Sequence, residues 1–183
     1  MKLNIGCGYK KIEGYIGVDI DPDARPDVLH DLTIFPWPFE NDTVEEILLI
    51  NILEHLCPDP KEYLKVWKEI YRICKPNAEI KIEVTHWRND NFYHDPTHVR
   101  PITPVGIAMM DQTRNQRDIV NNGSETKLGL QLKVDFDLVG VRYVVDSTTG
   151  IVGECHYLAK VIKPARITST SWRNKINETA KPL

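Results

Sequence analysis

The 183-residue sequence predicts an α/β fold built on a mostly parallel sheet, with an antiparallel edge strand and helices on both faces. Three observations lead to this class. Short apolar runs in the first half of the chain end at turn residues, which is typical of buried parallel strands. An amphipathic helix separates two of these runs. Two further strand-like runs follow each other near the end of the chain, so the alternation of strands and helices ends in a strand pair.

The first four predicted strands cover residues 3–5, 15–20, 27–29 and 46–50. The first strand ends at Gly6-Cys7-Gly8, and the second ends in an acidic stretch that begins at Asp19. In open α/β sheets, ligands bind outside the carboxyl ends of the strands. The sequence therefore places a glycine turn and a carboxylate where a ligand site is expected.

The clearest helix begins after Asp59, a residue type favoured at the N-cap, with Pro60 at the first helical position. Apolar side chains then recur at helical spacing as far as Cys74, which predicts one buried face. The pair Lys75-Pro76 ends the helix. Residues 79–84 alternate between charged and apolar side chains and predict a fifth strand.

The second half of the chain is less regular. Residues 85–101 predict a loop rich in histidine and aromatic side chains, and Thr103-Pro104 begins a short helix that reaches Gln112. Residues 115–127 are polar, and we expect them to be mobile. Residues 136–145 and 155–162 predict the late strand pair. We expect one domain over residues 1–165 and a polar tail over residues 166–183.

Composition excludes several classes of protein. The net charge of −3 gives no general electrostatic case for a nucleic-acid or membrane-surface partner. No apolar stretch approaches the roughly 20 residues that span a bilayer, and no signal peptide opens the chain. The four cysteines lie far apart without a CxxC pair, which fits reduced thiols. We therefore expect a cytoplasmic protein, and a homo-oligomer stays open.

The glycine turn and Asp19 have two interpretations. Glycines let a ligand approach the backbone closely, and Asp19, eleven residues after Gly8, could accept both hydrogen bonds from a ribose diol. The alternative is a tight turn with a capping carboxylate. A dinucleotide is disfavoured because Lys11 stands where its fingerprint has a third glycine. Only eight residues separate Gly8 from Gly17, which is short for a crossover with a full helix.

Several motifs, in their order and spacing, resemble the class I (Rossmann-like) S-adenosylmethionine-dependent methyltransferases. The resemblance covers roughly residues 2 to 85. The matching segments are Leu3-Asn4-Ile5-Gly6-Cys7-Gly8, Gly17-Val18-Asp19-Ile20-Asp21, His30-Asp31-Leu32 with Pro36-Trp37-Pro38-Phe39, Val44-Glu45-Glu46-Ile47 running into Asn51-Ile52-Leu53-Glu54-His55-Leu56, and Ile73-Cys74-Lys75-Pro76-Asn77.

The resemblance implies S-adenosylmethionine as cofactor. It implies that the glycine turn packs against the methionine part and that Asp19 binds the ribose hydroxyls. Asp31 would accept a hydrogen bond from the adenine amino group, with Ile20 and Leu32 near the ring, and Asn51 would lie beside the sulfonium. The expected cofactor-binding residues are Asn4, Gly6, Cys7, Gly8, Asp19, Ile20, Asp31, Leu32 and Asn51.

Two features depart from the family pattern. The family usually has helices before its first strand, whereas this chain starts at that strand, and the helix between the first two strands is nearly absent. We expect the late segments or a second subunit to supply the missing cover over the cofactor.

Methyl transfer from a sulfonium needs an aligned nucleophile and, for a hydroxyl or amine, a base that takes its proton. Histidine suits this role because it titrates near neutral pH. The predicted catalytic residues are His55, His94 and His98, and the predicted substrate-binding residues are Glu54, His86, Asp95 and Arg100. The structural alternative is that residues 95–97 form an ordinary turn and that the loop histidines bond to backbone.

A metal ion is a further possibility for the loop. His86, His94, Asp95 and His98 offer imidazole and carboxylate ligands that suit zinc or iron. The i, i+4 spacing of His94 and His98 would suit a helix, but Pro96 between them works against one. We therefore predict no metal site.

The sequence predicts an S-adenosylmethionine-dependent methyltransferase that acts on an oxygen or nitrogen atom of an unidentified small molecule. The alternative is a non-catalytic binding or assembly protein with the methyltransferase fold. A nicotinamide or nucleotide-sugar enzyme is disfavoured by the missing third glycine. A nucleic-acid amino group is disfavoured as target because Asn51 is followed by Ile52-Leu53-Glu54 and not by two prolines and an aromatic residue.

Overall fold

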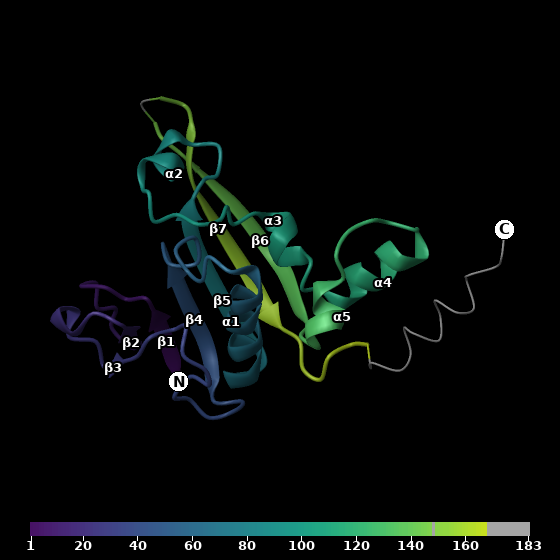
Figure 1. Cartoon of the computed structure of the whole chain (residues 1–183), viewed down its shortest axis with the longest axis horizontal. Coiled ribbons are helices and arrows are strands. Elements are labelled where there is room, and N and C mark those ends of the chain that lie inside the picture. The colour runs from purple at the N-terminus through teal and green to yellow at the C-terminus, as the bar shows by residue number, and fades with distance from the viewer. Residues whose placement is uncertain (148, 168–183) are drawn as a thin grey trace.

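Seven strands form one sheet in a computed structural model that describes residues 1–147 and 149–167 (Figure 1). The strand order is β3-β2-β1-β4-β5-β7-β6. Neighbouring strands from β3 to β5 are parallel, and β7 is antiparallel to both of its neighbours. The strands are β1 (Lys2–Ile5), β2 (Ile16–Asp19), β3 (Val28–Leu29), β4 (Val44–Ile50), β5 (Cys74–Thr85), β6 (Phe136–Val145) and β7 (Val152–Val161). The mostly parallel sheet is confirmed, with its antiparallel strand one position inside the edge.

The order of the strands reverses between β1 and β4. From β1 the chain moves outward to β2 and β3, then crosses back to β4 and continues to β5 on the other side. Loops that leave β1 and β4 therefore turn in opposite directions and leave a crevice at their carboxyl ends, where ligands of such sheets bind.

The helix predicted after Asp59 is α1 (Pro60–Ile73). One carboxylate oxygen of Asp59 accepts hydrogen bonds from the amides of Lys61 and Glu62 at 2.7 and 3.2 Å. The helix ends at Ile73, and β5 begins at the next residue. The other helices are α2 (Asp90–His94), α3 (Pro104–Ala108), α4 (Gln112–Val120), α5 (Leu128–Leu132) and the short 3-10 helix η1 (Pro22–Ala24).

The core lies between α1 and one face of the sheet. Ile47 on β4 and Ile80 on β5 are paired neighbours that are fully buried. The indole of Trp67 on α1 packs edge-on against Phe136, with 5.3 Å between ring centroids. Full burial of such a side chain stabilises the fold by about 1.5–3 kcal/mol, so this layer holds α1 on the sheet.

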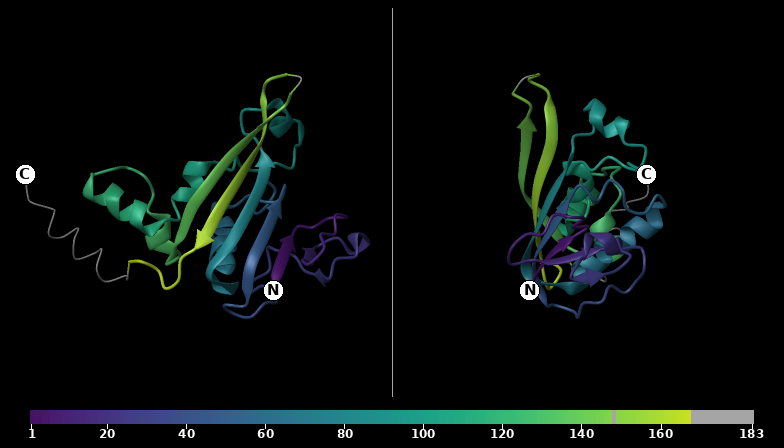
Figure 2. Two further views of the ribbon diagram at one scale, coloured as in Figure 1. Left: turned by 180° about the vertical axis from the view of Figure 1, so that it is seen from behind. Right: turned by 90° about the vertical axis from the view of Figure 1, so that its left-hand side faces the viewer.

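The opposite face of the sheet differs from the prediction of helices on both faces. Figure 2 shows the helices gathered on one side of the strands. The β1–β2 connection, residues 6–15, is too short for a helix and carries none. On this face Lys2, Glu46, Glu79 and Lys160 form a row across β1, β4, β5 and β7. A row of charged side chains thus crosses this face, where the prediction expected a helical layer.

Residues 115–127 are not the mobile stretch that their polarity predicts. The first part continues α4, and Asn115 is 1% exposed. Its amide nitrogen donates to the Met109 carbonyl at 3.0 Å, and its Oδ1 accepts from the Leu130 amide at 3.2 Å. These two hydrogen bonds of the buried Asn115 hold the segment in place. The spacing of apolar residues in the sequence cannot reveal such bonds.

Contacts with the domain continue past the predicted boundary at residue 165. The Arg166 side chain bonds to both carboxylate oxygens of the buried Asp135, and the Ile167 amide donates to Gln112. The rest of the predicted tail lies outside the described residues. All four cysteines are buried free thiols, in agreement with the absence of a disulfide framework. Within the described ranges no helix has the length and apolar character needed to cross a membrane.

Candidate functional site

The turn after β1 depends on its glycines. Gly6 has φ +67° and Gly8 has φ +48°. The amides of Gly6 and Cys7 both donate to the Val18 carbonyl, which ties the turn to β2. A Cβ atom on Gly6 would lie 2.5 Å from the side chain of Ile52, whereas one on Gly8 would meet nothing within 4 Å. The turn is therefore closed toward the loop after β4 and open above Gly8, where a ligand could approach the backbone.

Asp19 stands at the end of β2, facing this turn. Its Oδ2 accepts from the Gly8 amide at 2.7 Å, and its Oδ1 accepts from the Asp21 amide at 3.0 Å. Each carboxylate oxygen has two acceptor sites, so one remains on each oxygen for a further donor. Asn4 on β1 also holds the residues after the turn, because its side-chain nitrogen donates to the Lys10 carbonyl at 3.1 Å.

A cavity of about 210 Å³ opens beside Asp19. Five of the predicted cofactor-binding residues line it, namely Gly6, Asp19, Ile20, Asp31 and Leu32. Asn4, Cys7, Gly8 and Asn51 do not line it. The residues that the sequence analysis did not identify are His30, Thr33, Ile52 and Leu56. His30 precedes Asp31, Thr33 follows Leu32, and Ile52 and Leu56 lie in the motif after β4, so proximity to the quoted motifs was the available signal.

Asp31 is oriented by its neighbour Thr33. The Asp31 Oδ1 accepts from the Thr33 amide at 2.8 Å and from the Thr33 hydroxyl at 2.7 Å. These bonds hold the pKa of Asp31 below its ordinary value. Both bonds fall on Oδ1, so Oδ2 has acceptor capacity for a ligand donor at the far end of the cavity from the glycine turn.

The loop after β4, residues 51–57, separates this cavity from a second group of polar side chains. It starts at Asn51, which has φ +48° and whose amide donates to the Glu83 carbonyl at 2.8 Å. Ile52 and Leu56 line the cavity. The Glu54 carbonyl accepts from the Val99 amide at 2.8 Å, which ties the loop to residues 95–100.

Glu54, His55 and His98 form the second group. One ligand-capable atom from each residue lies within 4.8 Å of the other two. Glu54 is only 1% exposed, and neither of its carboxylate oxygens has a hydrogen-bond partner among the described residues. Burial raises the pKa of Glu54, while the backbone at Glu54 and Thr85 and the two imidazoles act in the opposite direction. The predicted candidates Glu54, His55 and His98 are thus brought together.

The hydrogen bonds of the two imidazoles define their tautomers. Thr97 gives its hydroxyl hydrogen to Asp95 Oδ1 at 2.6 Å, so its oxygen can only accept from His55 Nδ1, 2.8 Å away. His98 Nδ1 lies 2.7 Å from the Phe92 carbonyl, which is an acceptor only. Both Nδ1 atoms must therefore carry hydrogen, and both Nε2 atoms are left for another partner.

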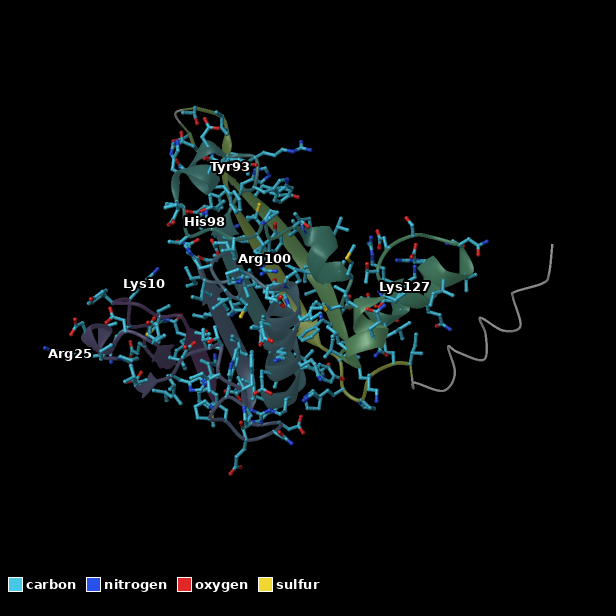
Figure 3. All side chains as sticks on the ribbon, in the orientation of Figure 1. Lys10, Arg25, Tyr93, His98, Arg100 and Lys127 are labelled. Carbon is cyan, nitrogen blue, oxygen red and sulfur yellow. The ribbon has the colours of Figure 1, made fainter. Side chains whose placement is uncertain are left out.

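The remaining predicted residues lie elsewhere. His94, at the end of α2, is exposed and does not join the cluster. His86 stacks on Trp87 with 4.2 Å between ring centroids and meets Tyr143 edge-on, and burial lowers its pKa. Asp95 is engaged with Thr97. Figure 3 shows His98 below α2, on the stretch of chain that leads to Arg100.

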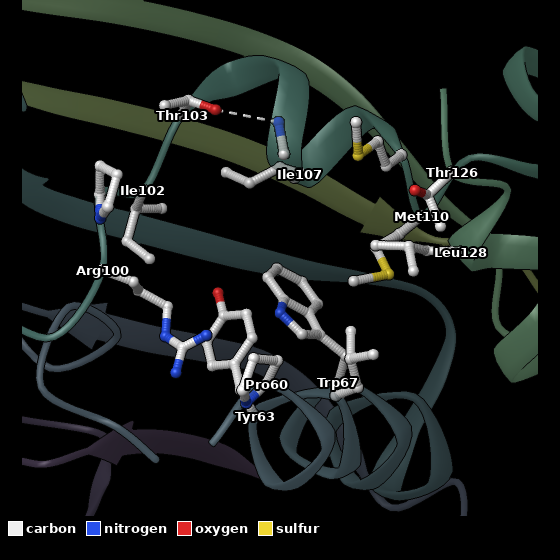
Figure 4. Close-up of a pocket in the computed structure, with 14 residues that line it drawn as sticks. Pro60, Tyr63, Trp67, Arg100, Ile102, Thr103, Ile107, Met110, Thr126 and Leu128 are labelled. Atoms are coloured by element: carbon white, nitrogen blue, oxygen red, sulfur yellow. Dashed lines mark hydrogen bonds between the residues drawn. The ribbon is translucent and has the colours of Figure 1, made fainter. Parts of the chain in front are cut away.

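Arg100 belongs to a different cavity, of about 350 Å³, between α1 and α3 (Figure 4). The centre of its guanidinium lies 3.9 Å from the centroid of the Tyr63 ring, and one of its terminal nitrogens donates to the Cys57 carbonyl. Trp67, Ile107 and Met110 form apolar walls. The guanidinium therefore fastens the 95–100 loop to α1 and to the loop after β4.

Comparison with solved structures gives the class of the fold. A SAM-dependent methyltransferase from Archaeoglobus fulgidus has a TM-score of 0.56 and 19% identity, covering 87% of this chain and 85% of its own. One from Methanosarcina mazei has a TM-score of 0.54 and 17% identity, covering 88% and 92%. The 1,6-didemethyltoxoflavin-N1-methyltransferase of Burkholderia thailandensis, solved with its substrate and S-adenosylhomocysteine, has a TM-score of 0.54 and 14% identity, covering 88% and 70%.

The chain therefore has the class I, Rossmann-like methyltransferase fold, as the resemblance implied. No protein-family model matches the sequence, and no curated protein matches it.

Proposed function

We propose that this protein is a methyltransferase that binds S-adenosylmethionine and transfers its methyl group in line to an oxygen or nitrogen atom of a small molecule. The observation that carries the proposal is the cavity beside the glycine turn, into which Asp19 and Asp31 both project at the carboxyl ends of β2 and β3. Two carboxylates with free acceptor sites, in a cavity also lined by apolar Ile20 and Leu32, match the donors and the flat ring of an adenosine group.

In this proposal Asp19 accepts from the ribose hydroxyls and Asp31 accepts from the adenine amino group. The open backbone above Gly8 receives the methionine part. Asn51, at the mouth of the β4 loop, stands beside the sulfonium. The bound cofactor is already activated, so the chain's main task is to align the nucleophile and to exclude water.

The acceptor side of the site is the group formed by Glu54, His55 and His98. Both Nε2 atoms are unprotonated in the neutral tautomers, so each is placed to take a proton from a nucleophile. His94 lies outside this group, so we do not retain it as a base. Asp95 acts through Thr97 on the orientation of His55 and is a positioning residue.

Calorimetric titration with S-adenosylhomocysteine tests the cofactor assignment. Asp19→Ala removes both acceptors for the ribose diol and should weaken binding by roughly tenfold or more, because a lost charged hydrogen bond is worth about 1.5–3 kcal/mol. Asp23→Ala, an exposed acid four residues away and outside the cavity, is the matched control and should bind as the wild type does. Equal affinity of the Asp19 variant and the wild type would refute the assignment.

A non-catalytic protein with the same fold is the second candidate. It is favoured by one observation: residues 6–15 form no helix, so the cover that a helix would give to the cofactor is missing there. Incubation with radiolabelled S-adenosylmethionine and a pool of small metabolites separates the two. Labelled product that depends on Asp19 supports the enzyme, and tight S-adenosylhomocysteine binding with no product supports the second candidate.

A further inference from the structure

We infer that Glu54, His55 and His98 bind a divalent transition-metal ion, and that this ion holds an oxygen atom of the methyl acceptor. The first part stands on the geometry of the three side chains alone. The second part rests on the proposed methyltransferase function. The sequence analysis predicted no metal site, and of the ligands it considered, His86, His94, Asp95 and His98, only His98 belongs to this cluster.

The donor set selects the class of ion. Two imidazole nitrogens and one carboxylate oxygen suit zinc, iron(II), manganese or cobalt, and they suit magnesium and calcium poorly because these prefer oxygen ligands alone. The three candidate ligand atoms lie within 4.8 Å of one another, so small side-chain rotations would bring all of them onto one ion.

The Glu54 carboxylate is the strongest sign that a ligand is expected here. A buried carboxylate without a hydrogen bond is expensive, and native structures rarely leave one in that state. Arg100, two residues after His98, contacts Tyr63 and Cys57 and forms no hydrogen bond with Glu54. Two imidazoles, those of His55 and His98, also lie near the carboxylate. A dication would complete the environment of Glu54.

Both imidazoles are already held as metal ligands usually are. A ligating histidine commonly donates its second ring nitrogen to a carboxylate, carbonyl or hydroxyl, which sets the ring orientation and leaves the other nitrogen for the ion. His98 does this with the Phe92 carbonyl, and His55 does it with Thr97, which is itself held by Asp95. Two independent hydrogen bonds therefore present two Nε2 lone pairs.

The position of the three ligands suits a role in the reaction. Glu54 and His55 lie on the loop whose Ile52 and Leu56 line the cofactor cavity. Three protein ligands leave coordination positions open for an exogenous oxygen. With both Nε2 lone pairs on the ion, the imidazoles would act as ligands in place of bases. A hydroxyl bound to the ion would lose its proton to solvent more readily, since a cation lowers the pKa of a bound hydroxyl group. The oxygen would then form a bond to the methyl carbon as the carbon–sulfur bond breaks, which yields a methyl ether and S-adenosylhomocysteine.

Cobalt(II) is the probe for the site, because its visible absorption reports the ligands directly. The full chain, freed of metal with a chelator, should bind one cobalt per chain with a spectrum that lacks a thiolate band. Glu54→Gln and His98→Ala should each weaken binding by more than about 100-fold, beyond the loss typical of a second-shell change. His94→Ala, in the same loop and outside the cluster, is the control and should bind cobalt as the wild type does.

Unfolding of a variant is checked separately. Glu54→Gln keeps the size of the side chain and removes an uncompensated charge, so without metal it should melt no lower than the wild type. Retention of cobalt by Glu54→Gln, or loss by His94→Ala, would overturn the three-residue site. A Glu54→Gln melting point far below that of the wild type would show that the carboxylate is a structural group, and this too would overturn it.

Acetohydroxamate, a bidentate oxygen ligand, tests the open positions. It should change the cobalt spectrum of the wild type, and an unchanged spectrum would mean a closed site that cannot hold an acceptor oxygen. S-adenosylhomocysteine titration of the same samples keeps the two proposals apart. If the protein binds S-adenosylhomocysteine but not cobalt, the metal site alone is overturned. If it binds cobalt but not S-adenosylhomocysteine, the cofactor assignment alone is refuted.

Discussion

At the scale of single residues, Gly6 is a position where a side chain would meet both backbone strain and a close neighbour. Its φ of +67° strains any L side chain, and its missing Cβ makes room for Ile52. Gly6→Ala should therefore lower the free energy of unfolding by roughly 2–3 kcal/mol, from the left-handed conformation and the clash together. It should also weaken S-adenosylhomocysteine binding, because Ile52 lines the cavity. Urea denaturation and calorimetry measure the two effects.

Gly8→Ala is the matched comparison, since Gly8 also has positive φ but has open space around it. It should lower stability by only about 1 kcal/mol, the strain of one left-handed residue. Equal losses for the two variants would contradict the close packing of the turn on Ile52.

A change at Thr97 tests whether its hydrogen bond positions His55, and it leaves the three proposed metal ligands unchanged. Thr97→Val keeps the shape of the side chain but removes the acceptor that orients His55. It should weaken cobalt binding by about 10- to 100-fold, as changes in the outer shell of metal sites do. Thr97→Ser restores the hydroxyl and should restore binding. If the valine variant binds cobalt as tightly as the wild type, the hydrogen bond does not prepare His55 for an ion.

Which residues the sequence could identify depends on their place in the chain. Asp19 and Asp31 follow short apolar strands, so their position at the ligand edge is a local consequence of the strand pattern. Glu54 and His55 lie 44 and 43 positions before His98, with α1 and β5 between them. Nothing in the residues between distinguishes His98 from His94. The turn at Asp95 and the hydrogen bond of His98 to Phe92 bring His98, and not His94, beside Glu54 and His55.

At the scale of elements, α1 supports the cavity beside Asp19 through Arg72. This side chain pairs with Glu69 at 2.7 Å and donates to the carbonyls of Trp37 and Phe39 at 3.0 and 2.8 Å. The Trp37 indole in turn donates to the carbonyl of Leu32, a wall of the cavity. Arg72→Met should therefore destabilise the fold by about 2–3 kcal/mol and weaken nucleoside binding.

Lys68→Met provides the control for Arg72, because Lys68 is an exposed cation on the same helix. Chemical denaturation should show a change within about 0.5 kcal/mol for this variant. A similarly small change for Arg72→Met would mean that the 35–41 segment is held by its apolar contacts alone.

Elements were predictable where local signals and tertiary packing agree. The Asp59 cap and the apolar face of α1 are such a case. The segment 115–127 is the opposite case, because the order of α4 comes from buried hydrogen bonds of Asn115 to distant backbone. The short spacing between Gly8 and Gly17 indicated that a helix between β1 and β2 is missing. That this leaves the second face of the sheet without a helical layer became visible only in the arrangement of all seven strands.

At the scale of the whole molecule, the far face of the sheet is held by charge in place of a helical layer. Glu46, only 7% exposed, receives hydrogen bonds from Lys81, Tyr15 and Lys2. These groups belong to β5, to the β1–β2 connection and to β1, so one carboxylate joins three parts of the chain. Burial tends to raise the pKa of Glu46, but the hydrogen bonds outweigh it and hold the pKa at about 2.

This carboxylate predicts how the stability of the molecule depends on pH. The ordinary pKa of glutamate, about 4.3 in the unfolded chain, exceeds the folded value, so folding favours the ionised form. The stabilisation is fully present above about pH 5 and declines as the pH falls toward 2. Because Lys2 and Lys81 are partly exposed, solvent screening reduces it to roughly 1–2 kcal/mol. Glu46→Gln should lose this amount at pH 7 and lose less at pH 2.

Glu79→Gln is the comparison on the same face. Its carboxylate, 38% exposed, lies 3.9 Å from the Lys81 ammonium and 3.7 Å from that of Lys160. Such an exposed pair contributes at most about 0.5 kcal/mol, so this variant should unfold nearly as the wild type does at every pH. Urea denaturation at pH 7, 4 and 2 measures the difference. If the two glutamine variants follow the same pH curve, charge on this face is only a solvated surface, and the β1–β2 connection must be held to the sheet by its backbone bonds to β2.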